Sequence, residues 1–357
     1  MSLDLSFYKG KRVLVTGHTG FKGTWLTKIL VNAGAIVIGY STCTPKKYSL
    51  FDMSGIESQI YNIKGDVRDF THLFSVFNKF KPEIVFHLAA QPLVRESSKN
   101  PVYTYETNVM GTVNIMECIR LNSCVKSVLN VTTDKVYCNN EWCWGYREDE
   151  PLDGFDPYSN SKSCSELVTH SYNNSFFSDD IVSVSTARAG NVIGGGDFAT
   201  DRIIPDCVRA VKRNMPISVR NPYSIRPYQH VLEPLIVYLI IAAKQYGNIK
   251  YQGYYNVGPD DCDCITTGDL VSLFCKYWGE GIGWENHAEK NAPHEANYLK
   301  LDCSKIKTTF GWKPRWHIEE CMQKVCEFTK VWIDDGNISA EMDREILEFI
   351  SDSQDVK

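Results

Sequence analysis

The 357-residue sequence lacks any run of like charges and any apolar stretch long enough to cross a membrane. Its most apolar later segment, residues 235–243, is far shorter than the roughly 20 residues that a spanning helix needs. No basic flank leads into an apolar segment near the N-terminus, as a signal peptide requires. The formal charge of -5 gives no electrostatic reason to expect nucleic acid. We therefore expect a cytoplasmic protein without membrane or nucleic-acid partners.

The cysteines form no CxxC pair, although there are 13 of them. Cys262 and Cys264 are too close together to form half of an ordinary zinc knuckle. In a reducing compartment such residues are mostly small apolar core side chains. The sequence therefore predicts neither a metal site nor a disulfide.

What the sequence does contain is an alternation of apolar strands with helical segments. Strands are predicted at 12–16, 35–40, 83–88, 127–132 and 181–187, and residues 65–69 are predicted to end a further strand, the third along the chain. Helices are predicted at 22–32, 70–80, 102–122 and 158–172. This alternation predicts an α/β fold with a doubly wound parallel (Rossmann) sheet, whose strands are apolar because both faces are buried.

The composition changes after Gly190. A glycine triplet at 194–196 is followed by Pro205, Pro216, Pro222 and Pro227, and arginines and aromatics become frequent. We predict a smaller, interleaved α/β substrate-binding lobe formed by residues 190–229 and 258–357. Residues 1–189 form the dinucleotide-binding domain, to which residues 230–257 return with a helix around Leu235 and a strand at 254–257.

A glycine-rich segment, residues 16–23 (TGHTGFKG), lies between the first strand and the first helix. Glycine permits close backbone approach there, and the helix N-terminus offers free N–H groups to a pyrophosphate. The GxxGxxG spacing resembles the extended short-chain dehydrogenase/reductase family. That resemblance implies NAD contacts from the following residues: Gly17, Thr19, Gly20, Phe21, Lys22, Gly23, Asp66, Val67, Leu88, Ala89, Ala90, Gln91, Thr132, Tyr158 and Lys162.

The choice between NAD and NADP stays open on the residues alone. NAD enzymes of this fold often carry an acid directly after the second strand, but here the first acid after that strand is Asp52. Lys46 or Lys47 offers a charge suited to a 2′-phosphate. NAD is implied by the resemblance.

A Tyr-x-x-x-Lys motif occurs twice, at Tyr158 and at Tyr246. Tyr246 precedes Gly247 at a predicted helix end, which indicates a surface coincidence. Tyr158 begins a helix, so Tyr158 and Lys162 share one helix face. A phenol has a pKa near 10, and a neighbouring ammonium, reinforced by the positive nicotinamide ring, lowers it. We expect Tyr158 to take a hydroxyl proton while hydride leaves the same carbon.

Thr133, Asp134 and Lys135 directly follow the strand that ends at residue 132. Ligands of doubly wound sheets bind just beyond the carboxyl ends of the strands. An acid and a second proton carrier beside Tyr158 indicate more than a simple dehydrogenase.

Several further segments resemble the CDP-glucose 4,6-dehydratase family over nearly the whole chain, weakening after about Trp332. They are residues 17–23, 133–135, 141–148, 158–162, 188–197, 294–296 and 301–305. The resemblance implies that Tyr158 deprotonates the C4 hydroxyl of glucose, that protonated Asp134 donates to the departing C6 hydroxyl, and that Lys135 is the C5 base. The product implied is a CDP-4-keto-6-deoxy sugar, used for surface polysaccharide such as O-antigen.

Asn191, Arg202, Arg226 and His294 are the candidate substrate ligands, together with Thr133. Arginine suits the pyrophosphate because its planar fork makes bidentate contacts. Cytosine as the base is implied by the resemblance alone. A homo-oligomer is implied in the same way, with the helices at 102–122 and 158–172 forming a dimer interface.

Two alternatives remain. A nucleotide-sugar 4-epimerase of the same fold needs Tyr158 and NAD, but has no use for Asp134 and Lys135. A non-catalytic dinucleotide-binding sensor needs neither the Tyr158–Lys162 pair nor a substrate lobe.

Overall fold

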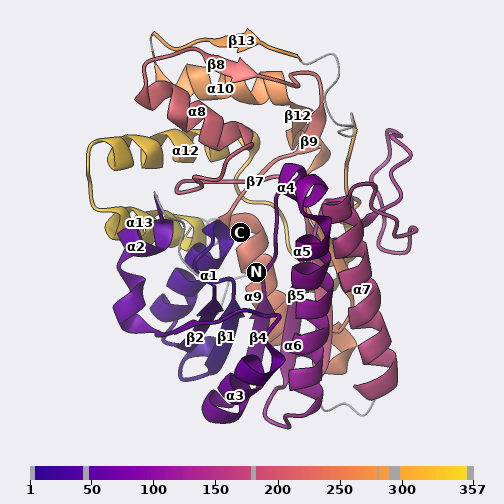
Figure 1. The fold of residues 1–357 in the computed structure, drawn as a ribbon. Coiled ribbons are helices and arrows are strands. Elements are labelled where there is room, and N and C mark those ends of the chain that lie inside the picture. Colours follow the sequence, from indigo (N-terminus) through magenta and orange to yellow (C-terminus); the bar gives the residue numbers. More distant parts are fainter. Residues whose placement is uncertain (1–4, 43–47, 178–181, 280, 289–297, 352–357) are drawn as a thin grey trace.

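The computed structural model describes residues 5–42, 48–177, 182–279, 281–288 and 298–351. A seven-stranded parallel sheet forms its centre, in the order β11-β6-β5-β4-β1-β2-β3 (Figure 1). The strands are β1 (Arg12–Thr16), β2 (Ile36–Ser41), β3 (Tyr61–Lys64), β4 (Ile84–His87), β5 (Ser127–Val131), β6 (Ser183–Ala189) and β11 (Tyr254–Val257). The strand order reverses direction at β1, between β2 and β4, where ligands of such sheets bind. The predicted fold class is confirmed.

Helices cover both faces of this sheet. α1 (Phe21–Asn32) and α9 (Leu232–Gln245) pack on one face, and α3 (Phe70–Phe80), α6 (Gly111–Arg120) and α7 (Pro157–Phe176) on the other. Side chains alternate between the two resulting cores, because successive residues of a strand point to opposite faces. In β1, for example, Val13 and Val15 belong to one core and Leu14 to the other.

Two helices differ from their predicted limits. The predicted helix at 102–122 is a composite: α5 (Pro101–Tyr105), a π-helical turn (Glu106–Met110) and α6. α7 is longer than predicted and begins after Asp156, whose side chain accepts hydrogen bonds from the N–H groups of Tyr158 and Ser159. An acidic N-cap followed by proline is a strong start for a helix, and it fixes where Tyr158 lies.

The third strand also differs from the prediction. β3 ends at Lys64, and residues 65–69 form the loop beyond it rather than its end. Within this loop the Asp66 carboxylate accepts hydrogen bonds from the backbone N–H and the guanidinium of Arg68. This local pairing satisfies the backbone in place of a strand ladder.

A smaller lobe lies beyond the carboxyl ends of the strands (Figure 1). It is built from α8 (Ile203–Lys212), α10 (Thr267–Trp278) and α12 (Ile318–Ile333) with two short ladders, β8 (Ile217–Val219) with β13 (Trp284–Asn286) and β9 (Ile225–Pro227) with β12 (Cys264–Thr266). β7 (Val192–Ile193) pairs with β10 (Gln229–His230) between this lobe and the sheet. The remaining helices are α2 (Leu50–Ser54), α4 (Val94–Lys99), α11 (Ser304–Phe310) and α13 (Ile338–Ser351).

The C-terminal helices connect the lobe back to the sheet. α11 packs against β11, and α13 packs against α1 and α2. Both lie within the segment 258–357 that the sequence assigns to the lobe, and the predicted domain limits stay a prediction. Among the described residues, no helix has both the length and the apolarity for a bilayer crossing.

Candidate active site

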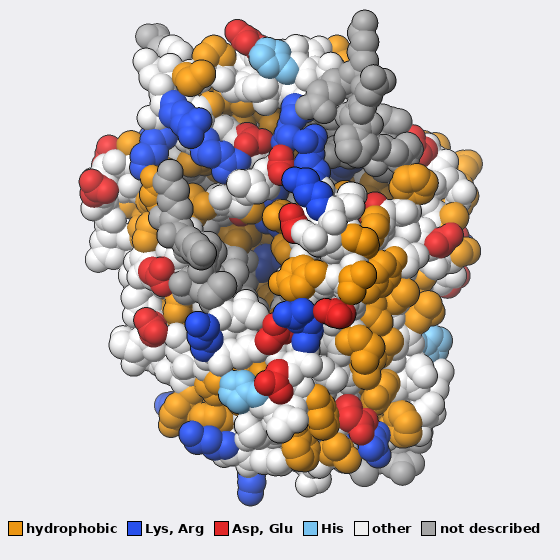
Figure 2. All heavy atoms as spheres, viewed as in Figure 1, with side chains coloured by type: hydrophobic (Ala, Val, Ile, Leu, Met, Phe, Trp, Pro, Cys, Tyr) orange, Lys and Arg blue, Asp and Glu red, His pale blue; other side chains and the backbone are white. Residues whose placement is uncertain are grey.

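A cavity of about 880 Å³ lies between the carboxyl ends of the strands and the lobe. Its walls include residues from the loops after β1, β2, β4, β5 and β6 and from α8, β8 and β9. Figure 2 shows a hollow on this face, with Lys and Arg side chains gathered around its upper rim. A cleft of this size at the strand ends is where a fold of this class holds its ligands.

The glycine-rich segment forms a tight cradle at one end of the cavity. A Cβ atom on Gly17 would lie 2.8 Å from the backbone nitrogen of Ala89, and one on Gly23 would lie 2.1 Å from the carbonyl oxygen of Gly17. α1 begins next to it with Gly20 as N-cap and no side-chain cap, and the residues of its first turn line the cavity, which leaves their N–H groups to a ligand there. This geometry fits the pyrophosphate of a dinucleotide, and NAD is the group it suits.

Most of the other predicted cofactor residues line the same cavity. They are Thr19, Phe21, Lys22, Asp66, Val67, Leu88, Ala89, Ala90, Thr132, Tyr158 and Lys162. Gln91 does not line it, because its side chain is held by Thr104 Oγ1 and by the backbone of Leu93. Where many NAD enzymes carry an acid, Ser41 and Thr42 line the wall, and Thr19 and Ser41 hydrogen-bond each other at 2.8 Å. Lys46 and Lys47 lie outside the described residues.

Tyr158 and Lys162 meet the cavity from the first turns of α7. Burial raises the pKa of Tyr158 to about 12, although a hydrogen bond with Thr133 and the charge of Arg202 oppose the rise. In the free protein the pKa of Tyr158 is thus raised overall, and the expectation that Lys162, reinforced by the nicotinamide ring, lowers it stays a prediction for the complex with NAD. The Lys162 ammonium donates to the carbonyl oxygen of Val131 at 3.1 Å, and burial lowers its pKa to about 7.

The second Tyr-x-x-x-Lys pair does not line this cavity. Tyr246 caps the end of α9, and its hydroxyl donates to Glu83 at 3.0 Å. It is a structural contact between α9 and the loop before β4.

Asp134 lies at the centre of the site. After β5, Thr133 caps a 3-10 turn (Asp134–Val136), and Thr133, Asp134 and Lys135 all line the cavity. Thr133 Oγ1 donates to Asp134 Oδ1 at 2.9 Å, while Asp134 is 1% exposed and its Oδ2 has no hydrogen-bond partner among the described residues. This oxygen is thus left for a hydrogen bond with a ligand in the cavity, since buried polar atoms are costly to leave unpaired.

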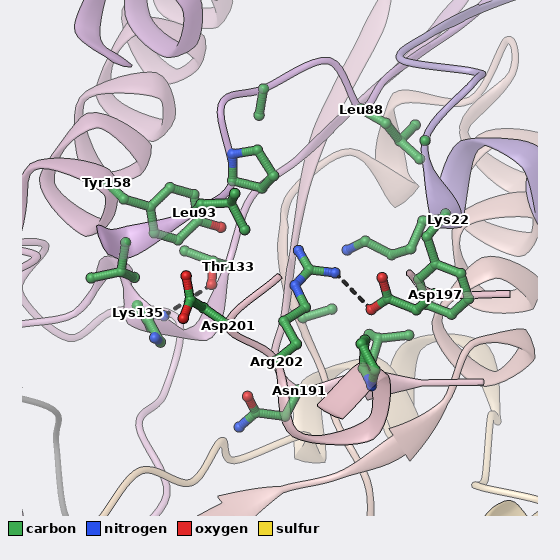
Figure 3. Close-up of a pocket in the computed structure, with 18 of the residues that line it drawn as sticks. Lys22, Leu88, Leu93, Thr133, Lys135, Tyr158, Asn191, Asp197, Asp201 and Arg202 are labelled. Atoms are coloured by element: carbon green, nitrogen blue, oxygen red, sulfur yellow. Dashed lines mark hydrogen bonds and ion pairs between the residues drawn. The ribbon is translucent and has the colours of Figure 1, made fainter. Parts of the chain in front are cut away.

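The lobe and α1 together bring a cluster of charges to the cavity wall. Figure 3 shows Lys22, Asp197 and Arg202 pointing toward one another, and Arg202 pairs with Asp197 at 2.9 Å. Asn191 and Arg226 also line the cavity, with Arg226 7% exposed and donating to the carbonyl of Ile225. His294 lies outside the described residues.

Sequence reasoning missed several residues of this wall. Asp197, Asp201 and Arg220 line the cavity, and Arg220 pairs with Asp201 at 2.9 Å. Asp197 follows the glycine triplet directly, which was a usable signal for a loop at the site. The Asp201–Arg220 pair joins residues far apart in sequence, and no local pattern indicates it.

One trio of potential metal ligands lies away from the cavity. Cys262, Asp263 and His317 come together at the start of α12. Asp263 already accepts hydrogen bonds from the N–H of Ile318 and from His317 Nδ1, at 2.9 and 2.8 Å. These bonds account for the buried carboxylate as a helix cap, and the expectation of no metal stays a prediction.

Comparison with known proteins agrees with this geometry. The family model described as GDP-mannose 4,6 dehydratase matches residues 14–325. The CDP-glucose 4,6-dehydratase of Salmonella typhimurium is 48% identical over 98% of this chain and 99% of its own.

Solved structures show the same fold at low identity. The dTDP-glucose 4,6-dehydratase of Bacillus anthracis, in complex with NAD, aligns with a TM-score of 0.76 at 20% identity, covering 90% of this chain and 97% of its own. The UDP-glucose 4-epimerase of Thermus thermophilus, also with NAD, has a TM-score of 0.78 at 22% identity, covering 89% and 99%. At these identities the match concerns the fold alone, whereas the longer and stronger sequence match decides the family. The chain belongs to the CDP-glucose 4,6-dehydratase family, within the extended short-chain dehydrogenases/reductases.

Proposed function

We propose that the protein is an NAD-dependent CDP-glucose 4,6-dehydratase, which converts CDP-glucose to CDP-4-keto-6-deoxyglucose and water. The observation that carries the proposal is the meeting of Tyr158, Asp134 and Lys135 in one cavity with the glycine cradle. The 48% identity to a CDP-glucose 4,6-dehydratase over nearly the full length supports the choice of substrate.

The residues that would hold NAD are the glycine cradle, Asp66 and Val67, and the loop from Leu88 to Ala90. When bound, NAD supplies the acceptor for hydride from C4, the donor that returns it at C6, and a positive ring charge. The cradle excludes side chains from the space beside Gly17 and Gly23, and the N–H groups of α1 bind the pyrophosphate.

The proton at the C4 hydroxyl passes to the Oη atom of Tyr158. Thr133 hydrogen-bonds this phenol and so holds it in place. Because burial keeps the pKa of Tyr158 high, the phenolate needs positive charge nearby. Arg202 supplies part of it, and we assign a further part to the Lys162 ammonium, one helical turn away on α7.

Elimination of water needs a base at C5 and an acid at the C6 hydroxyl. Once C4 is a ketone, the C5 proton is acidified, and we assign its removal to Lys135, which lines the cavity beside Asp134. Asp134 gives its proton to the departing C6 hydroxyl, and water leaves. The C5 position is then reprotonated, so the sugar nucleotide loses only the elements of water.

The substrate is held from the lobe side. Arg202 and Arg226 suit the pyrophosphate, and Asn191 suits the sugar hydroxyls. Asp197 orients Arg202, since their ion pair fixes the guanidinium toward the cavity.

The proposal includes a homo-oligomer formed through α5, α6 and α7. Large apolar side chains are exposed on α5, on α7 and on the π turn between α5 and α6, at Val102 (70%), Met110 (50%), Leu167 (53%) and Phe176 (54%). A dimer would bury this face, which is unusual for a monomer surface. A cytoplasmic location is also proposed, in keeping with the free state of the described cysteines.

The 4-epimerase is the second candidate, because epimerases share this fold. An epimerase leaves C5 and C6 untouched and has no task for Asp134. The placement of a buried acid beside Tyr158 favours the dehydratase.

The test is incubation of the purified protein with NAD and CDP-glucose, UDP-glucose or dTDP-glucose in separate reactions, followed by mass spectrometry. Loss of one water from CDP-glucose alone is the expected result. Conversion to a galactose isomer without a mass change would make it an epimerase, and no change in any tube would make it a binding module.

A further inference from the structure

Glu166 is a buried carboxylate that the reaction above does not use. It lies on α7 with 1% of its surface exposed. One oxygen accepts a hydrogen bond from Thr132 Oγ1, and the other accepts from Thr186 Oγ1 at 2.7 Å and from Arg188 at 3.0 Å. Both oxygens are therefore satisfied by groups on β6 and at the end of β5.

Glu166 continues the face of α7 that carries the catalytic pair. Tyr158, Lys162 and Glu166 are spaced four residues apart, which places them on one side of a helix, one turn after another. Lys162 donates to Val131 and Glu166 accepts from Thr132, so two successive turns of α7 are attached to two successive residues of one strand end. The next two residues of that strand end are Thr133 and Asp134.

Arg188 balances the charge of Glu166. It is 2% exposed, and it also donates to the Tyr137 hydroxyl at 2.9 Å and to the Glu148 carbonyl at 3.0 Å. A buried ion pair of this kind contributes little to stability compared with apolar side chains of similar volume. Stability alone therefore does not explain why a charge lies at this position.

We propose that Glu166 is a positioning residue for the dehydratase reaction proposed above. Its carboxylate fixes the Tyr158–Lys162 face of α7 against the strand end that carries Asp134, and its negative charge holds the proton on the Lys162 ammonium. The proposal concerns both the position of Tyr158 relative to Asp134 and the positive charge of Lys162 beside Tyr158.

The electrostatics of Lys162 agree with this role. Burial and the charge of Lys22 both lower the pKa of Lys162, and Glu166 is the group that opposes them. Loss of the Lys162 proton would remove a cation from beside Tyr158 and so make its phenolate harder to form. Neutralising Glu166 is therefore expected to raise the pH at which Tyr158 becomes active.

The experiment compares a charge-removing variant with a charge-preserving one. Glu166→Gln/Arg188→Met removes both charges and leaves no unpaired ion in the core; Glu166→Gln, which keeps the side-chain shape, is measured alongside it. Thr186→Val removes one hydrogen bond to Glu166 and keeps its charge, from a residue that does not line the cavity. For each, thermal unfolding, kcat and KM with CDP-glucose and the pH profile of kcat are measured.

The expected result is a folded double variant with kcat reduced on the order of 100-fold, the cost of a misplaced catalytic group. KM stays near the wild-type value, and the acid limb of the profile moves to higher pH. Thr186→Val leaves the limb in place. The proposal would be overturned if the folded double variant kept the acid limb of the wild type. It would also be overturned if Thr186→Val moved that limb by the same amount as the double variant.

A second readout is independent of turnover. The titration of Lys162, followed by NMR as each variant minus the same variant with Lys162→Met, reports the proton on its ammonium directly. This midpoint should fall when Glu166 is neutralised, because Glu166 raises the pKa of Lys162. If the wild type dehydrates no sugar nucleotide, the proposed function fails while this titration still decides the role of Glu166.

Discussion

A Cβ atom on Gly190 would lie 1.9 Å from Oδ2 of Asp134. The backbone at the end of β6 thus forms the wall against which the buried acid rests. No residue with a side chain can occupy position 190 while Asp134 keeps its place.

Gly190→Ala is therefore expected to displace the acid without unfolding the protein. We expect kcat for water loss to fall about 100-fold, since small misplacements of a catalytic group have costs of this size. Steady-state kinetics with CDP-glucose checks it. Gly258→Ala is the matched control, because its Cβ would come no closer than 3.4 Å to its neighbours. Equal kcat in the two variants would contradict the placement of Asp134.

The two tyrosine–lysine pairs give an internal comparison. Tyr158→Phe removes the proton acceptor of the C4 hydroxyl, and a reduction in kcat of about 10³-fold is expected. Tyr246→Phe removes only the hydrogen bond to Glu83. It should leave kcat unchanged and reduce the free energy of unfolding by about 1 kcal/mol. Comparable losses of activity in both variants would show that the wrong pair has been chosen.

NAD binding should be sensitive to Gly23. Its Cβ would lie 2.1 Å from the carbonyl oxygen of Gly17, so alanine forces the cradle open. We expect Gly23→Ala to weaken NAD binding more than about tenfold, or 1.4 kcal/mol, in isothermal titration calorimetry. Gly283→Ala serves as the control, since nothing lies within 4 Å of its Cβ. Unchanged affinity in Gly23→Ala would place the pyrophosphate elsewhere.

Glu233 provides a pH-dependent prediction. This buried carboxyl accepts hydrogen bonds from the N–H groups of Arg315 and Trp316, and burial raises its pKa from 4.5 to about 7. Between these values the folded protein binds more protons than the unfolded chain, so its free energy of unfolding falls as pH rises through that window. The loss amounts to about 3 kcal/mol.

Glu233→Gln removes this titration. In urea unfolding at pH 5 and pH 8, the free energy of unfolding of the variant should rise relative to that of the wild type at the higher pH. Glu117→Gln is the comparison, because Arg120 lowers the pKa of Glu117 and its titration falls below this window. A Glu233→Gln difference that is the same at both pH values would contradict the raised pKa.

The proposed dimer face can be tested by one charge. Leu167→Glu on α7 is expected to give a monomer in analytical ultracentrifugation, because a carboxylate would be buried in the interface. Leu347→Glu on α13 is the control, with a side chain that is 67% exposed on another part of the molecule. If the wild-type protein is itself a monomer, the proposed dimer is contradicted.

The sheet and the cradle could be predicted because their signals are local. Apolar strands followed by helical periodicity indicate the layers, and the segment at 16–23 places the glycines between strand and helix. The π turn at Glu106–Met110 could not be predicted, since it leaves no distinct composition. It depends on tertiary contacts such as the hydrogen bonds from Asn108 to Gln91 and Ser161.

Within the site, residue types were predictable and their partners were not. Thr133, Asp134 and Lys135 follow a strand and could be assigned to the cavity from that position alone. The contact between Asp134 and Gly190, and the bond between Arg202 and Asp197, arise from the folded arrangement. The raised pKa of Tyr158 in the free protein could not be predicted, because the degree of burial cannot be read from a helix face.

The chain passes repeatedly between the sheet and the lobe. It leaves after β6, returns through β10 to α9 and β11, leaves again for β12 and α10, and ends with α13 against α1 and α2. A lobe threaded in this way has no single junction at which recombination could exchange it for another. We therefore expect new sugar-nucleotide preferences in such a protein to come from substitutions along the cavity wall and not from exchange of the lobe.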